Sequence, residues 1–227
     1  ADSSRFLTEV MGEQAWAVIR QREGDTVTLI GGPLMPADKL ADIPLVEGIP
    51  EHGRRFDHLV AVPFRQIAER GFTATDDSTP LVVMEVRVEH EIALHELLAA
   101  LPEQAAQFSD RGGFETDDDT YAATVGQIIS EEIGNGEGAN LVIGRHYRAQ
   151  LSDWDAAAAL AVLRRLLERE RGAYWTYCFW TGDRFLIGAS PERHVSVTKK
   201  QVRMNPISGT FRLRGLQPAE RKDRLLE

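Results

Sequence analysis

Cysteine is almost absent from this sequence, and so is any long hydrophobic run. Cys178 is the single cysteine among 227 residues, so the chain can form neither an internal disulfide bond nor a cysteine metal cluster. No segment reaches the ~18 apolar residues that a membrane-spanning helix needs, and the N-terminal ADSSRFLTEV lacks a signal-peptide pattern. We therefore expect a cytoplasmic protein without a membrane partner.

Positive charge is scarce as well. The chain has 26 Lys and Arg against 35 Asp and Glu, a net charge of −9. Because binding to a nucleic-acid backbone requires a concentrated basic face, we expect no nucleic-acid partner. The six histidines show no H-x-x-x-H spacing, which argues against a zinc site, and neither G-x-S-x-G nor G-x-x-x-x-G-K occurs.

Turn residues and apolar alternation divide the N-terminal half into short elements. They predict a hairpin of residues 15–19 and 26–30 around Glu23-Gly24-Asp25, a loop over 31–53, strands at 59–62 and 81–88, and a helix over 91–101. The segment 108–119 is polar, acidic and rich in glycine. It marks the boundary between a variable N-terminal lobe, residues 1–112, and a second lobe, residues 113–227.

The second lobe has clearer signals. We predict a helix over 120–133 capped by Asp117–Asp119, a strand over 140–148, a helix over 154–171 capped by Asp153, and antiparallel hairpins from residue 173 onward. This order indicates an α+β fold. The last residues, Leu225-Leu226-Glu227, read as the start of a helix without an exit, so we expect that Glu227 is not a natural domain end.

Two polar turns near the C-terminus are candidate sites. Glu192 follows a proline at the start of a strand, where a rigidly held and partly desolvated carboxyl can act as a general acid. A surface glutamate paired with Arg184 or Arg193 is the alternative. Backbone N–H groups and the hydroxyl of Gly209 and Thr210 could receive a carboxylate, or form an ordinary hairpin turn. The residues alone leave these alternatives open.

Taken together, the turns GASPER and PISGTFR, with GEGANLVIGR upstream, resemble the paired signature of the chorismate-binding enzymes. That family holds anthranilate synthase component I, aminodeoxychorismate synthase and the isochorismate and salicylate synthases. The resemblance extends from about Tyr121 to Glu227. It implies antiparallel sheets packed face to face with helices outside, a four-layer α/β/β/α fold that residues 113–227 would complete only in part.

The resemblance also implies a reaction and roles for five residues. A nucleophile adds to C2 of chorismate and the C4 hydroxyl leaves, with Glu192 as the general acid. Asn140 stands where water-using members have a lysine base, which implies ammonia as the nucleophile. Ser208 replaces the lysine of the PIKGT variant, which excludes a lysine-linked intermediate. Gly209 and Thr210 would hold the ring carboxylate near Mg²⁺.

The family's metal ligands and partners complete the expectation. Its two Mg²⁺-binding glutamates come after the position that matches Glu227, so Mg²⁺ ligands are expected beyond this chain, which alone would be an inactive half-site. Ammonia would come from a glutamine amidotransferase domain or subunit. The oligomeric state stays open, with a homodimer among the options.

Local differences indicate which member this is. The family's NPSPY and LLES elements are missing, so tryptophan inhibition is not expected. GAYWT, NPISGTFR and VPFRQIAERGF resemble the phenazine-type 2-amino-2-deoxyisochorismate synthases of antibiotic biosynthesis, which add ammonia without eliminating pyruvate. The alternatives are anthranilate synthase component I and a catalytically incomplete scaffold subunit. As for Cys178, its aromatic neighbours indicate a buried hydrophobic residue and not a nucleophile.

Overall fold

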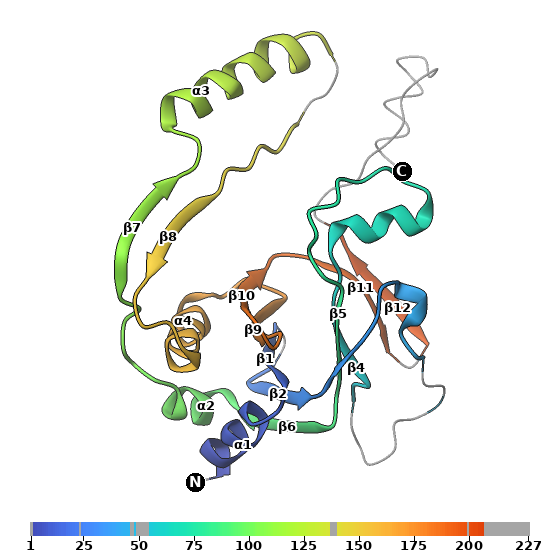
Figure 1. The fold of residues 1–227 in the computed structure, drawn as a ribbon, viewed down its shortest axis with the longest axis vertical. Coiled ribbons are helices and arrows are strands. Elements are labelled where there is room, and N and C mark those ends of the chain that lie inside the picture. The colour runs from blue at the N-terminus through green and yellow to red at the C-terminus, as the bar shows by residue number, and fades with distance from the viewer. Residues whose placement is uncertain are drawn as a thin grey trace. The chain divides into compact units, whose positions relative to one another are not determined.

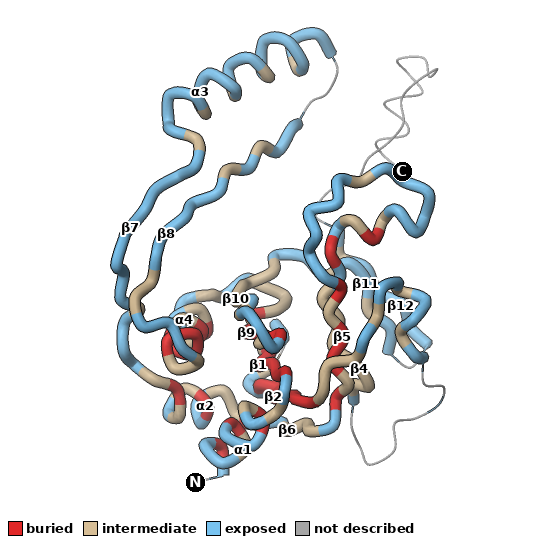
Figure 2. The backbone as a smooth tube through the Cα atoms, in the orientation of Figure 1, coloured by how far each residue is buried: buried red, intermediate tan, exposed pale blue. Residues whose placement is uncertain are grey.

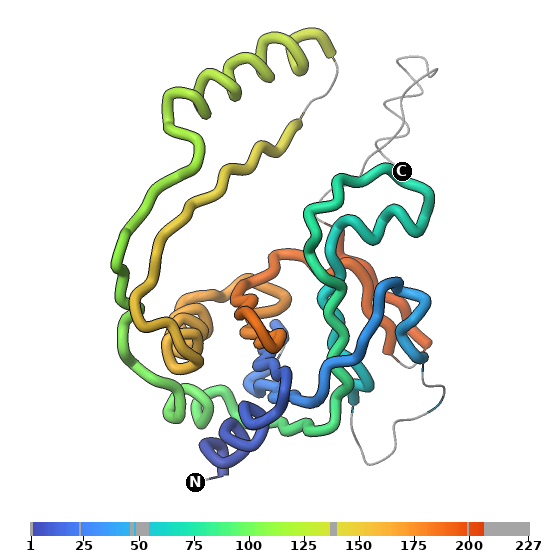
Figure 3. The backbone as a smooth tube through the Cα atoms, in the orientation of Figure 1, coloured from blue at the N-terminus to red at the C-terminus, as the bar shows by residue number. Residues whose placement is uncertain are grey.

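The computed structural model describes residues 2–22, 24–45, 48, 55–136, 140–198 and 200–206. The chain divides into two units: one comprises residues 1–101 and 163–227, and the other Pro102–Val162. Figure 3 traces how the chain leaves the first unit, forms the second and then returns. None of the described helices is long and apolar enough to cross a membrane.

The first unit is built on a five-stranded antiparallel sheet (Figure 1). Its strands, in spatial order, are β10 (Phe185–Ser190), β9 (Trp175–Trp180), β1 (Ala15–Gln21), β2 (Thr26–Gly32) and β6 (Val88–Ala93). The β1–β2 and β9–β10 hairpins agree with the sequence prediction, since each is closed by a short polar turn. The central pairing of β1 with β9 joins segments that are far apart in the sequence.

A smaller sheet packs against one face of this sheet. It contains β3 (Leu34–Met35), β5 (Val82–Glu85) and β4 (His58–Ala61), in that order. Met84 and Val86 form one buried cluster with Ala17, Ile19 and Ile30 of the larger sheet. Figure 2 shows the buried residues along β1, β2 and β5. The core of the first unit therefore includes an apolar layer between two sheets.

The predicted single strand over 81–88 is wrong. It divides into β5 and β6, which belong to different sheets. Between them the amide of Val86 donates to Asp57 O and that of Arg87 donates to Gly31 O, so the chain crosses from one sheet to the other. Alternation of apolar residues continues through the crossing and therefore gave no sign of it.

The helices of the first unit are mostly short. They are α1 (Asp2–Met11), the 3₁₀ helices η1 (Leu40–Asp42) and η3 (Phe64–Arg70), and α2 (Leu94–Ala100). Helix α1, which the sequence reading did not anticipate, contacts β1, β2, β6 and α2. The predicted helix over 91–101 begins only at Leu94, because residues 91–93 pair with β2.

Helix α4 (Ala156–Arg169) belongs in part to each unit. Its C-terminal half is fixed to the end of α2 by Arg164, whose Nη1 donates to the carbonyls of Leu98 and Leu101, each at 2.8 Å. The predicted cap, Asp153, is wrong. Asp155 accepts the amide of Ala158 at 2.8 Å and caps the helix, whereas Asp153 lies in the left-handed region with φ of 50°.

The second unit contains a two-stranded ribbon and a helix. Its elements are β7 (Phe108–Phe114), α3 (Asp118–Gln127), which continues as a π-helix, η4 (Ile128–Ile133), and β8 (Tyr147–Leu151). The predicted cap is confirmed, since Asp117 accepts the Thr120 amide at 2.8 Å. The predicted 140–148 strand is wrong at its start, since β8 begins only at Tyr147. Strand β7, which was not predicted, lies within the polar segment 108–119.

A last hairpin follows β10. It consists of β11 (Arg193–Thr198) and β12 (Gln201–Asn205), as predicted. The described sheets are all antiparallel and accompany helices, which agrees with the predicted α+β class. The four-layer arrangement stays a prediction, and so do the two lobes, whose predicted boundary between residues 112 and 113 falls inside β7. The predicted C-terminal helix lies outside the described residues.

Candidate functional site

The turn that carries Glu192 joins β10 to β11. The hydroxyl of Ser190, the last residue of β10, donates to Glu192 O at 2.8 Å, and the Glu192 amide donates back to Ser190 Oγ at 3.4 Å. Pro191 fixes its own φ and has no amide hydrogen to satisfy. Strand β11 then begins at Arg193. The backbone of Glu192 is therefore fixed locally while its side chain projects as an exposed group.

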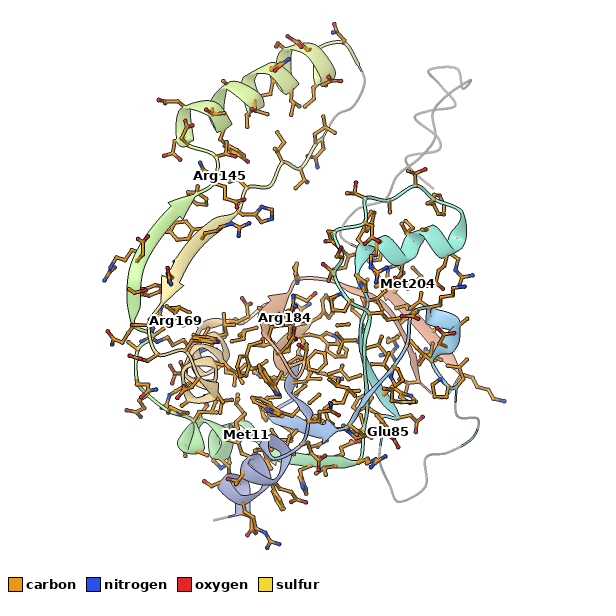
Figure 4. The ribbon with its side chains drawn as sticks, in the orientation of Figure 1. Met11, Glu85, Arg145, Arg169, Arg184 and Met204 are labelled. Carbon is orange, nitrogen blue, oxygen red and sulfur yellow. The ribbon has the colours of Figure 1, made fainter. Side chains whose placement is uncertain are left out.

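The two arginines expected to pair with Glu192 have other partners. Arg184, labelled in Figure 4, binds Asp183 with an Nη2–Oδ2 distance of 2.8 Å. Arg193 donates from Nη2 to Asn205 Oδ1 at 2.8 Å, and its guanidinium lies 5.3 Å from the centre of the Tyr174 ring. Within the described residues the Glu192 carboxylate forms no ion pair. The surface-pair alternative is therefore not observed, but the described residues also do not desolvate Glu192 as expected for a buried acid.

Two groups of the β9–β10 hairpin have strongly shifted pKa values. Hydrogen bonds from Arg184 and then Thr181 lower the pKa of Asp183 to about 2, so this carboxyl stays ionised and serves its turn. Burial raises the pKa of the Cys178 thiol to about 12. Because the thiolate is the reactive form, Cys178 is an inert buried residue, as the sequence predicted.

Asn140 is exposed and belongs to the second unit. The segment between Asn140 and β8 is attached to the start of α3 by side-chain contacts. Tyr121 donates its hydroxyl to Ile143 O at 2.8 Å, and Arg145 Nη1 donates to Thr116 O at 3.0 Å. These bonds fix an irregular segment whose backbone forms no ladder.

Arg145 has further contacts that sequence reading missed. Its Nη1 also lies 2.7 Å from Asp118 Oδ1, and its guanidinium lies 3.7 Å from the centre of the Phe114 ring and 4.8 Å from that of Tyr121. Figure 4 labels Arg145 near the start of α3. We call this group of Arg145, Phe114, Thr116, Asp118 and Tyr121 the Arg145 clamp. An arginine five residues after Asn140, with aromatic residues upstream, was the available signal.

The candidate residues are distributed over separate parts of the chain. Glu192 lies in the first unit and Asn140 in the second, and each unit is described by itself. Ser208, Gly209 and Thr210 lie outside the described residues. The convergence of these five residues in one pocket therefore stays a prediction. In the part of the chain that is described, no three His, Cys, Asp or Glu side chains gather as a metal site.

One described pocket lies between the two sheets of the first unit. It has a volume of about 80 Å³ and a mainly apolar lining of Ile19, Gln21, Thr28, Ile30, Phe56, His58, Leu59 and Trp175. Glu192 does not line it. This pocket offers apolar surface and one imidazole, which does not match the acid and amide pair expected for the reaction.

Comparison with known proteins gives the family. The sequence profile of a family described as chorismate binding enzyme matches residues 66–227. Two proteins named anthranilate synthase, phenazine specific, from Pseudomonas chlororaphis and Pseudomonas fluorescens, are each 46% identical to this chain, over 184 and 182 residues. The alignments cover 80% of this chain and 28% of each relative, so the chain matches little more than a quarter of their length. With a profile match over more than half its residues, this chain belongs to the chorismate-binding enzyme family.

Proposed function

We propose that the protein containing this chain aminates chorismate at C2 with ammonia derived from glutamine and releases the C4 hydroxyl. The product would be 2-amino-2-deoxyisochorismate, for phenazine or related antibiotic biosynthesis. The observation that carries the proposal is the 46% identity with two relatives whose names specify anthranilate synthase and phenazine. Asn140, an amide at the family's nucleophile position, agrees with ammonia as the nucleophile.

In this proposal each residue has a defined chemical role. The nitrogen lone pair of ammonia forms the bond to C2, both ring double bonds shift by one position, and the C4–O bond breaks. Glu192 gives its proton to the departing oxygen, which leaves as water, and the Asn140 amide oxygen accepts an N–H of ammonia. The locally fixed turn at Glu192 supports this assignment. Ser208 carries no amine, so no lysine-linked intermediate is included.

The proposed reaction requires Mg²⁺, although the roles of Glu192 and Asn140 do not involve the ion. The described residues do not fit a metal site, because no suitable group of three ligands occurs among them. In the family the ion supplies electrostatic stabilisation to the substrate carboxylate and leaving group. Ligands beyond Glu227 would hold it.

Product mass tests the reaction. The protein containing this chain is incubated with chorismate, Mg²⁺ and either ammonium or glutamine. The expected product contains nitrogen and keeps the enolpyruvyl group. Isochorismate would contradict amination, and turnover with ammonium but not with glutamine would contradict the amidotransferase partner.

A second candidate is anthranilate synthase proper, which the names of the two relatives favour. This reaction adds elimination of pyruvate to the same amination. A coupled assay for pyruvate separates the two, because only anthranilate formation releases it. An absence of any turnover would instead favour a catalytically incomplete scaffold.

Glu192→Gln tests the general acid. The amide has the same size but cannot donate the required proton, so kcat is expected to fall by about 10²–10⁴ with the fold unchanged by circular dichroism. Glu132→Gln, at an exposed residue of η4, is the matched control and should leave kcat unaltered. Normal turnover of Glu192→Gln would remove the acid assignment.

Asn140→Lys tests the choice of nucleophile. The longer cationic side chain should weaken use of ammonia, measured as kcat/KM for ammonium. Asn140→Gln retains the amide and should lose less. Equal ammonia use in both variants and the wild type would show that Asn140 does not orient the nucleophile.

A further inference from the structure

A polar pocket of about 20 Å³ lies at one end of the five-stranded sheet. Three of its seven lining residues are arginines; the lining consists of Arg20, Gln21, Arg22, Glu170, Arg171, Ala173 and Thr176. They come from the end of β1, the start of β9 and the residues after α4. We call it the arginine pocket. It shares no residue with the candidate catalytic site.

Strand alternation determines the face that this pocket occupies. Along β1, Ala17 and Ile19 point into the apolar layer between the sheets, so Arg20 points to the opposite face. Arg20 is paired in register with Thr176 of β9, and these neighbours share that face. The amide of Arg22 donates to Tyr174 O at 3.0 Å, which closes the end of the ladder. The backbone of the pocket is therefore fixed by sheet pairing.

One nitrogen of the Arg20 guanidinium lacks a partner. Arg20 as a whole is half-buried, but its Nε is buried and donates to no acceptor in the described part of the chain. In the same described ranges, no carboxylate oxygen lies within 4.0 Å of a nitrogen of Arg20, Arg22 or Arg171. A buried N–H without an acceptor is unfavourable, so an acceptor is expected beside it, and the three guanidinium groups favour one that carries a counter-charge.

Glu170 does not supply this counter-charge. Its Oε1 accepts the amides of Gly172 at 2.7 Å and Ala173 at 3.0 Å. These backbone hydrogen bonds lower the pKa of Glu170, which is therefore ionised and committed to the turn after α4. Three guanidinium groups and one carboxylate leave the lining with a net charge of +2. The pocket is thus an electropositive cavity that is accessible at Arg22 and Arg171, both exposed.

We propose that the arginine pocket binds a small oxyanion, such as phosphate or the carboxylate of a small acid. The guanidinium of Arg20 forms its floor and those of Arg22 and Arg171 its rim. Guanidinium groups bind phosphate and carboxylate oxygens through paired N–H donors, which makes arginine the preferred residue for such anions. A volume of about 20 Å³ is little above the ~10–15 Å³ that one water requires, so the pocket cannot enclose a whole metabolite. A bound anion would extend past the exposed rim at Arg22 and Arg171.

Direct binding of inorganic phosphate tests this site. The protein containing this chain is exchanged into phosphate-free buffer without chorismate, then titrated calorimetrically with sodium phosphate, with sodium chloride adjusted to hold ionic strength constant. Saturable binding is expected, together with a rise in Tm that follows ligand concentration. A parallel titration with acetate measures the carboxylate arm. Binding of either anion supports an oxyanion site and shows which source is preferred.

Arg20→Gln is the decisive variant. It removes the half-buried guanidinium with its unsatisfied Nε–H, so affinity for the bound anion should fall at least ~10-fold, while Tm in anion-free buffer should equal or exceed that of the wild type. Arg5→Gln, at an exposed position of α1, is the matched control and should bind as the wild type does. Should Arg20→Gln fail to fold, Arg171→Gln at the exposed rim must weaken binding instead.

Three results would overturn the proposal. In the first, the wild type binds neither phosphate nor acetate saturably. In the second, Arg20→Gln and Arg171→Gln bind the anion as tightly as the wild type does. In the third, Arg5→Gln loses as much affinity as Arg20→Gln. Because chorismate is absent from these titrations, they are independent of the proposed reaction.

Discussion

The two units differ in how far their side chains are buried. Val18, Leu29 and Cys178 in the first unit are fully buried, whereas neither β7 nor α3 in the second unit has a buried side chain. Apolar burial therefore stabilises the first unit. The ribbon and α3 of the second unit rely instead on caps, hydrogen bonds and cation–π contacts, above all the Arg145 clamp. The buried apolar side chains of that unit, Ala158, Ala159, Leu160 and Ala161, lie in α4. Glu192 follows β10, a strand of the apolar first unit, and Asn140 precedes β8, a strand of the exposed ribbon in the second unit. The two candidate residues thus depend on different forces.

The largest expected effect is a break in the core of the first unit. Leu29→Ala leaves a cavity where a side chain with 0% exposure was packed, and should lower the free energy of unfolding by about 2–5 kcal/mol. Denaturant titration followed by tryptophan fluorescence measures it. Leu45→Ala, the same exchange at a position with 91% exposure, should change stability little. A similar loss in both variants would contradict the role assigned to burial.

The Arg145 clamp should respond differently. Arg145→Ala removes two cation–π contacts and the hydrogen bonds to Thr116 and Asp118, a loss of about 1–2 kcal/mol confined to the second unit. Hydrogen exchange should accelerate in α3 and β8 but not in β1 or β9. Arg111→Ala, an exposed arginine in the same ribbon, is the control. Faster exchange throughout the first unit would show that the units are not independent.

Alkaline pH should act on the first unit through Cys178. Its folded pKa, about 12, exceeds the ordinary thiol value, so the folded state retains a proton that the unfolded state has lost. Between about pH 9 and pH 12 the free energy of unfolding should therefore fall by up to about 1.4 kcal/mol per pH unit from this group. Cys178→Ala removes that contribution. An identical alkaline slope in variant and wild type would contradict the buried thiol.

The smallest effect is expected at the cap of α3. Hydrogen bonds from the Thr120 amide and hydroxyl lower the pKa of Asp117. The cap is thus fully formed above the unfolded pKa and is lost as pH falls through the folded value, below about pH 4. The protection factors of the amides in the first turn, which correct for the intrinsic exchange rate, should fall a few-fold in acid or in Asp117→Ala. Asp119→Ala, without a cap hydrogen bond, should change them less.

Local signals predicted much of the first unit. The Glu23-Gly24-Asp25 turn and the alternating residues beside it specify the β1–β2 hairpin within the sequence itself. Asp117, three residues before its partner amide, likewise specified the start of α3. In both cases the interacting groups are close in sequence, so the pattern contained the information.

Long-range effects explain what sequence reading missed. The polar SDRGGF gave no sign of a strand, yet it forms one, in which Gly112 takes φ of 63° at a register shift of the ribbon, where an added Cβ would overlap Arg148 O. Either Asp153 or Asp155 could have capped α4, and the path of the chain selected the second. The Arg145 clamp joins residues about 30 positions apart. As for the site, turn chemistry indicated Glu192 and the family resemblance indicated Asn140, while their exposure depends on packing.

The pairing of β1 with β9 also has a consequence for biosynthesis. Residues Trp16–Gln21 of β1 are synthesised well before their partner strand β9, which lies about 150 residues later in the chain. At a synthesis rate of about 5–20 residues per second, that delay is roughly 10–30 s. Through this interval β1 can pair with β2 alone, and its other side presents unpaired N–H and C=O groups to any neighbouring nascent chain. The yield of folded protein is therefore expected to depend on how well this unpaired edge is protected during synthesis, for example by a chaperone.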